Sequence, residues 1–211
     1  MVLDAIKRRA LAYHHRSSRG PQGERVVRSL SAHLGRLDSL LDIGCGDGVN
    51  LKKLAAAANA SRFAGVDVLV RPSATIDVVE YDGHNLPFPD RSFDGVTLVD
   101  VLHHCDDAER VLAEALRVAT KVVAIKDHFA FGPVTSKMLY WMDLVGNAKD
   151  SIFSPGKYLH PDEWVRMIAR TGGKLEALDW PLKTHDLPWR IVGWPELQFT
   201  AKIAPVASRV A

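Results

Sequence analysis

Three glycines that alternate with other residues form the stretch of this chain best suited to approach a ligand. They follow an apolar run at residues 40–43, which predicts a short buried strand, and they are Gly44, Gly46 and Gly48. Because glycine adopts positive φ and has no side chain, such a loop turns tightly and its backbone can come close to a cofactor. Residues 50–58 are rich in Leu, Lys and Ala and predict a helix. Strand, glycine turn and helix N-terminus together predict a cofactor site.

Two details distinguish this loop from a dinucleotide-binding loop. Its spacing is Gly-x-Gly-x-Gly, whereas the dinucleotide fingerprint is G-x-G-x-x-G. Asp42 lies inside the strand end, where its carboxylate would repel a pyrophosphate but would suit a ligand with positive charge, such as an amino-acid moiety. A nicotinamide dehydrogenase is therefore an alternative that the spacing disfavours.

A second acid, Asp67, stands where a ribose-binding carboxylate is expected. Residues 62–67 predict the second strand, and Asp67 ends it, 23 positions beyond Gly44. This is close to the roughly 20-residue spacing typical of a carboxylate that binds ribose hydroxyls. The alternative is an acid that only caps a helix or shapes a loop. Residues 68–75 leave little room for a helix, and Pro72 argues against one, so the crossover to the third strand is expected to be abbreviated.

A third acid, Asp82, follows the predicted third strand at residues 76–81 and precedes Gly83. A carboxylate accepts a hydrogen bond from an exocyclic amine, and the adjacent glycine leaves space for a ring, so the pair suits an adenine. Taken alone, an Asp-Gly pair would simply be a turn.

Two of these stretches resemble a known family. The glycine loop resembles motif I of the class I S-adenosylmethionine (SAM) methyltransferases. Residues 82–94 resemble the segment D-x-x-x-L-P-F-x-D-x-S-F-D of the methyltransferase-11 (UbiE-like) branch, nearly residue for residue. The resemblance is specific over about residues 38–128 and implies SAM as cofactor and S-adenosylhomocysteine as product, with Asp82 at the adenine amino group. The cofactor-binding residues that it implies are Asp42, Gly44, Cys45, Gly46, Gly48, Asp67, Val68, Asp82, Gly83, Asp100 and Val101.

Histidines follow the next two predicted strands. The strand at residues 93–101 leads to His103 and His104, and the strand at residues 121–126 leads to His128. In open α/β sheets these strand ends face the ligand, so His104, His128 and, more weakly, His103 are candidates for a general base. A structural role, in which one packs near the sulfonium, is equally compatible with the pattern. No metal site is expected, because no Cys or carboxylate set stands at ligand spacing around His103 and His104.

The alternation of strands and helices predicts an α/β, doubly wound and largely parallel sheet in a single domain. The resemblance implies a Rossmann-like sheet of seven strands in the order 3-2-1-4-5-7-6, with strand 7 antiparallel. Residues 1–35 are expected to form N-terminal helices, 38–128 the SAM-binding core, 129–160 a substrate-side insertion, and 161–211 a C-terminal helix and strands. Further helices are predicted at residues 2–16, 22–34, 108–119, 134–146 and 161–170, and further strands at 174–180 and 196–203.

Two of these helices lie where they could face a ligand. The helix at residues 2–16 is amphipathic and is expected to pack with a solvated face, or to act as a lid. The helix at residues 134–146 is apolar nearly all round, so it is expected to be buried on several sides or to face a partly apolar acceptor.

Composition limits the classes of partner. The chain has 211 residues, 47% hydrophobic and 25% charged, with a formal net charge of +2, and this balance is too slight to indicate a nucleic-acid partner. No apolar run approaches the roughly 18 residues that span a bilayer, so no membrane partner is expected. The two cysteines offer no disulfide framework, which favours a cytoplasmic location. The oligomeric state stays open.

We therefore expect SAM-dependent methyl transfer, by in-line displacement, to a small and partly apolar or aromatic acceptor. The acceptor atom stays open between O, N, S and C. Two alternatives remain, namely a non-catalytic SAM-binding scaffold for a partner protein and a methyltransferase that acts on a macromolecule.

Overall fold

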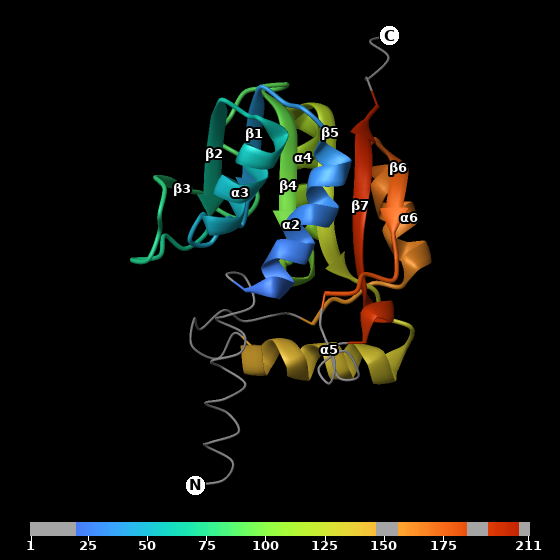
Figure 1. Ribbon diagram of the computed structural model, residues 1–211. Coiled ribbons are helices and arrows are strands. Elements are labelled where there is room, and N and C mark those ends of the chain that lie inside the picture. Colours follow the sequence, from blue (N-terminus) through green and yellow to red (C-terminus); the bar gives the residue numbers. More distant parts are fainter. Residues whose placement is uncertain (1–19, 147–155, 185–193, 207–211) are drawn as a thin grey trace, which may run out of the picture.

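A seven-stranded sheet organises the computed structural model, which describes residues 20–146, 156–184 and 194–206 (Figure 1). The order of the strands is β3-β2-β1-β4-β5-β7-β6, as the resemblance implied. Their bounds are β1 Ser39–Ile43, β2 Arg62–Asp67, β3 Val78–Glu80, β4 Phe93–Val99, β5 Ala119–His128, β6 Gly173–Asp179 and β7 Gln198–Pro205. The helices are α2 Pro21–Leu34, α3 Val49–Ala58, α4 Ala108–Val118, α5 Pro133–Gly146 and α6 Pro161–Arg170, with short 3₁₀ turns η1 Leu102–His104 and η2 Pro195–Leu197.

The first five strands are parallel, and β7 runs antiparallel to both of its neighbours. β1 lies between β2 and β4, with Ile43 opposite Val66 on one side and Leu98 on the other. β7 pairs with β5 so that Gln198 lies opposite His128. Because parallel strands end at the same edge, the residues that follow β1 to β5 gather along one border of the sheet.

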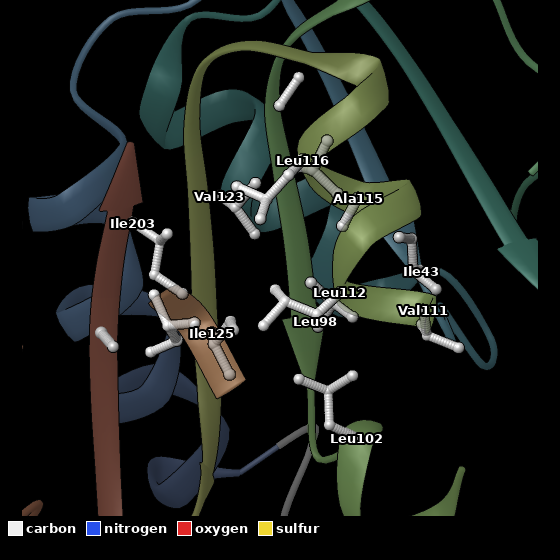
Figure 2. Close-up of a cluster of buried hydrophobic side chains, with 14 of the residues drawn as sticks. Ile43, Leu98, Leu102, Val111, Leu112, Ala115, Leu116, Val123, Ile125 and Ile203 are labelled. Atoms are coloured by element: carbon white, nitrogen blue, oxygen red, sulfur yellow. The ribbon is translucent and has the colours of Figure 1, made fainter. Parts of the chain in front are cut away.

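Helices cover both faces of the sheet, and the side chains of the strands alternate between them. Leu40 of β1 packs in the cluster formed with α2 and α3, whereas Leu41 packs in the larger cluster on the opposite face, formed with α4 and α6. In Figure 2 the apolar side chains of α4, including Leu112 and Leu116, lie against Leu98 and Val123 of the sheet. This packing holds the strand ends in a rigid frame.

The helix α5 lies apart from the two covering layers. Figure 1 shows it crossing beneath the carboxyl ends of the central strands instead of lying along a face. Its bounds agree with the predicted helix at 134–146. Its position places this part of the insertion at the edge where the predicted site residues gather (Figure 1).

Several predicted strands have different ends in the structure. β3 spans only Val78–Glu80, since it is an edge strand with a single neighbour. β4 ends at Val99 because Asp100 adopts a left-handed conformation with φ of 56°. β5 begins at Ala119, directly after α4, and extends to His128 because β4 and β7 both pair with it. The last strand starts at Gln198, after the turn η2.

The helix predicted at residues 2–16 lies outside the described residues, as does part of the insertion, residues 147–155.

The abbreviated crossover is confirmed, since residues 68–77 contain no helix and β2 still pairs in parallel with β3. Within the described ranges, no helix combines the length and the apolar character that a membrane span requires.

Candidate functional site

The glycine loop is held to the end of β2 by backbone hydrogen bonds. The amides of Gly44 and Cys45 both donate to the carbonyl of Val66, at 2.8 and 3.1 Å. Gly44, Gly46 and Gly48 all have positive φ, between 57° and 76°. Gly48 is also the N-cap of α3, so the loop ends at the positive end of a helix. The strand, tight turn and helix expected from the sequence are therefore in place.

The surroundings of the glycines differ across the loop. A Cβ added to Gly44 would lie 2.5 Å from Cγ2 of Val101, so Gly44 packs tightly against the residue that follows β4. A Cβ added to Gly46 would meet nothing within 4 Å. Gly46 is thus the point at which the loop leaves room for a ligand to approach the backbone.

Asp67 is placed next to this open side of the loop. Its Oδ2 accepts a hydrogen bond from the amide of Gly46 at 2.8 Å, and its Oδ1 accepts from the amide of Leu69 at 3.2 Å. An ionised carboxylate offers about four acceptor positions, so two remain for ribose hydroxyls. Asp67 therefore shapes the loop and can still bind a ligand.

The adenine end of the predicted site lies after β2 and β3. Asp82 is exposed, and its carboxylate accepts from the amides of His84 and Asn85 and from the Asn85 side chain. These bonds lower the pKa of Asp82 to about 2, so it is ionised at neutral pH. A Cβ on Gly83 would lie 3.2 Å from Val68. Val68 is 58% exposed, which leaves an apolar side chain beside Gly83 where a ring could pack.

Asp42 lies beneath the loop and is 2% exposed. Thr97 of β4 donates to its Oδ1 at 2.6 Å. Burial raises the pKa of Asp42 to about 7, against the opposing effect of the Thr97 hydrogen bond. Its predicted contact with the amino group of a ligand stays a prediction, and in the ligand-free chain the carboxyl carries its proton through much of the neutral range.

Cys45 is buried inside the same loop. Burial, together with the nearby carboxylates of Asp42 and Asp67, raises the pKa of its thiol to about 12. Cys45 is therefore a neutral wall of the predicted site and is unsuited to act as a nucleophile at neutral pH.

The three candidate histidines meet beyond β4 and β5. The ring of His103 lies with its centroid 4.0 Å from that of His104 and 5.2 Å from that of His128. Its Nδ1 lies 2.6 Å from Oδ1 of Asp127, and its Nε2 lies 3.1 Å from Oδ2 of Asp143. The structure thus brings all three histidines together and adds two carboxylates.

The charges of these histidines differ. Burial acts to lower the pKa of His103, but the carboxylates of Asp127 and Asp143 outweigh it and raise the pKa to about 10. Burial lowers the pKa of His104, and the positive charge of His103 adds to this effect. Burial also lowers the pKa of His128, helped by the ammonium group of Lys126. His104 and His128 are therefore neutral near pH 7 and able to accept a proton.

Asp100 and Val101 join the cofactor side to this cluster. Asp100 has a left-handed backbone, and its Oδ1 lies 2.5 Å from Nζ of the buried Lys126. The same oxygen lies 3.5 Å from Nδ1 of His128. This ion pair orients Asp100 at the strand end.

Four residues near the cluster were not among the predicted site residues, namely Lys126, Asp127, Asp143 and Tyr158. Asp143 comes from α5, and the Tyr158 hydroxyl donates to its carboxylate. A signal for Asp143 was present, because it is the single acid in a mostly apolar helix. Asp127 directly precedes His128, and its complete burial could not be foreseen from a strand end.

A cavity of about 310 Å³ lies between α4 and α6 and reaches His103. Its apolar wall includes Leu102, Leu159, Trp164 and Met167, and its rim carries charged side chains such as Glu109 and Arg170. A volume of this size is typical of a small-molecule site.

Comparison with known proteins matches residues 41–122 to the family described as a methyltransferase domain. The 27-O-demethylrifamycin SV methyltransferase of Amycolatopsis mediterranei is 37% identical over 94 residues, which cover 38% of this chain and 34% of that protein. The demethylmenaquinone methyltransferase of Renibacterium salmoninarum is 27% identical over 181 residues, which cover 76% of this chain and 68% of that protein. The chain thus spans about a third of the first relative and about two thirds of the second.

A solved structure supports the same fold. It is a chain in the complex between the Haloferax volcanii Trm112 methyltransferase activator and a methyltransferase, with a TM-score of 0.70 and 14% identity. The match covers 99% of this chain and 97% of that one. At this identity the likeness establishes the fold alone.

The contrast between the loop glycines gives a first prediction. Gly46→Ala places a methyl group in open space and strains a positive φ, so we expect a loss of about 1–2 kcal/mol in the free energy of unfolding and a marked loss of SAM affinity. Gly172→Ala is the matched control, because Gly172 also has positive φ and nothing within 4 Å of an added Cβ. It should lose similar stability and keep its SAM affinity. Urea denaturation and calorimetric titration with SAM measure both quantities, and equal SAM affinity in the two variants would contradict this placement of the ligand.

The burial of Asp42 gives a second prediction, which concerns pH. The folded chain keeps the Asp42 proton up to about pH 7, whereas the ordinary pKa of an exposed aspartate is 3.8. As pH rises between these values the unfolded state loses its proton first, so wild-type stability falls by up to about 1.4 kcal/mol per pH unit from this group. Asp42→Asn removes the effect and keeps an acceptor for Thr97. We expect its stability relative to wild type to increase from pH 5 to pH 7 and to level off above that, as measured by urea denaturation. A constant difference across this range would show that Asp42 is ionised in the folded chain.

Proposed function

We propose that this chain, which belongs to the class I SAM-dependent methyltransferases, transfers the SAM methyl group to a small, partly apolar or aromatic acceptor. The observation that carries this proposal is the convergence of the glycine loop, Asp67 and Asp82 at one edge of the sheet. The loop's open position at Gly46 and the bond between Gly46 and Asp67 support it. Asp42 lies in β1, Asp67 ends β2 and Asp82 follows β3, an order that suits methionine, ribose and adenine.

The residues present fit a cationic cofactor. Asp42, Asp67, Asp82 and Asp100 all lie along this edge, and a positive charge is favoured near carboxylates. The apolar side chain of Val68 beside Gly83 fits the face of a ring. Asp42 would be expected to ionise when an ammonium group is bound above it, which would compensate for part of its burial.

A small acceptor is supported by the relatives. One relative's name puts the methyl group on an oxygen of a rifamycin, and the other's acceptor is a menaquinone precursor. Both are small molecules. The near-neutral net charge of +2 makes a nucleic-acid acceptor the weaker alternative.

The chemistry asked of the protein is chiefly positioning. When bound, SAM supplies a methyl group already activated on a sulfonium sulfur. Holding an acceptor atom in line with that methyl group can contribute up to about 7–11 kcal/mol, whereas a general base contributes roughly 3–5 kcal/mol. The loop and the acids hold the cofactor, while His128 or His104 is suited to take a proton from the acceptor. His103 is a buried cation in the ligand-free chain and positions its neighbours.

Cofactor binding gives the third prediction. We expect Asp67→Ala and Asp82→Ala each to weaken SAM binding by roughly 10–100-fold, because each removes a charged hydrogen-bond acceptor. Asp90→Ala is the control, since Asp90 lies in the same segment as Asp82 and is 74% exposed in its pair with Arg117. Its SAM affinity should match wild type. Calorimetric titration with SAM and with NADH measures these affinities, and this reading of the edge fails if both site variants bind SAM normally or if NADH binds in its place.

Turnover gives the fourth prediction. With small phenols and quinols as acceptors, His128→Ala should reduce turnover at saturating SAM by up to about 10²–10⁴-fold and leave SAM affinity nearly unchanged. Product mass identifies the methylated acceptor, and the same measurement on His104→Ala shows which histidine carries the proton. Full turnover in both variants would exclude both as the base. Absence of turnover across small acceptors, with methylation of added protein or RNA, would favour the macromolecular alternative.

A further inference from the structure

Several buried nitrogen atoms of the histidine cluster have no hydrogen-bond partner. They are Nε2 of His103, Nδ1 of His104 and Nδ1 of His128. The His103 side chain is 1% exposed, so its Nε2 is shielded from bulk water. This atom forms an ion pair with Asp143 Oδ2 at 3.1 Å, although the geometry is not that of a hydrogen bond. Buried polar atoms without partners are rare and call for a ligand or an ion.

His103, His104 and Asp143 present one donor atom each within 4.8 Å of one another. Ligands around a metal at roughly 2.1 Å lie about 3–4 Å apart, so a closure of about 1 Å would complete the set. Two imidazoles and one carboxylate are a donor set that first-row transition metals bind while keeping positions open.

The surroundings of this set are those of a metal site. Asp127 Oδ1 lies 2.6 Å from Nδ1 of His103, which leaves Nε2 as the metal-binding nitrogen of that ring. A ligating histidine that donates its other N–H to a carboxylate is the usual outer shell of a protein metal site. Tyr158 orients Asp143 from the other side through its hydroxyl.

We propose that His103, His104 and Asp143 bind one divalent transition-metal cation at the acceptor side of the site. The cation would take the place of the proton on Nε2 of His103, which faces the Asp143 carboxylate. Positions left open on it would suit an oxygen atom of the acceptor. That role toward the acceptor rests on the proposed function, whereas binding of the cation does not. With His104 as a ligand, His128 is the remaining candidate for the base.

A second group in the same cluster, Asp100, His103, Asp127 and His128, also brings donor atoms within 4.8 Å. Its carboxylates are already satisfied, because Asp100 is paired with Lys126 and Asp127 accepts from the amides of Leu102 and His128. The ammonium group of Lys126 would also repel a cation there. The set with Asp143 is therefore the better site.

Co²⁺ is the probe for the fifth prediction. The full chain is first treated with a chelator and then titrated with Co²⁺, without SAM, while the visible absorption of the bound ion is recorded. We expect one equivalent to bind. Asp143→Asn and His104→Ala should each weaken this binding by more than the roughly 10–100-fold that loss of an outer-shell partner costs.

His160→Asn is the matched control. His160 lies 3.5 Å from Asp162 in a surface pair, and asparagine preserves a helix cap at that position. Its Co²⁺ binding should equal that of wild type. Calorimetric titration with SAM shows that each variant is folded, and it also separates failure of the metal site from failure of the proposed function. The proposal is overturned if wild type binds no stoichiometric Co²⁺, which would mean that the cluster holds only a proton. It is also overturned if Asp143→Asn and His104→Ala bind Co²⁺ as wild type does.

Discussion

The parallel pairing of β1 with both β2 and β4 is the constraint on which the rest of the structure depends. Ile43 lies between Val66 and Leu98, so the chain leaves β1, β2 and β4 at the same border. The chain winds from β1 to β2 and β3 on one side and then crosses from β3 to β4 on the other side of β1. In open α/β sheets, ligands bind where the direction of winding reverses in this way. Each strand end then supplies a polar group to that border. No single residue creates the site, because its members are far apart in the chain and only the register brings them together.

Two buried acids near this border meet the cost of burial in opposite ways. Asp42 receives one hydrogen bond from Thr97, which does not offset its loss of hydration, so its pKa rises to about 7. Asp127 is equally buried, but it pairs with His103 and accepts from backbone amides, and its pKa falls. A buried charge persists only when it is paired and hydrogen-bonded. The loop side of the site is therefore able to become more negative when a cation binds, while the histidine side is already ionised.

The sequence predicted the part of the site that is local in the chain. β2 was predicted with its observed ends, because a short run of strand-forming residues ends directly in an acid. The glycine loop and Asp82-Gly83 could be recognised because each is a contiguous motif. The sequence also predicted the order of the strands, through the resemblance to a family. The end of β4 depends on the left-handed backbone of Asp100, and the hydrophobic pattern of the sequence does not indicate that conformation.

The histidine cluster shows why spacing along the chain is a poor guide to ligand sets. We expected no metal site because no Cys or carboxylate set stands at ligand spacing around His103 and His104, yet the fold brings the Asp143 carboxylate to 3.1 Å from His103. Asp143 lies about forty residues further along and reaches His103 only because α5 crosses beneath the strand ends (Figure 1).

The same crossing divides the border into two parts. The strand ends β1 to β3 carry groups suited to a cofactor, and they come from the segment that the family match covers. His103 and His104 also come from that segment, whereas His128 and Asp143 lie beyond it, and Asp143 is supplied by α5. Differences in acceptor among related chains must arise from groups that touch the acceptor. The cluster around His103, which joins residues inside and outside the matched segment, is therefore where we expect the acceptor to be selected.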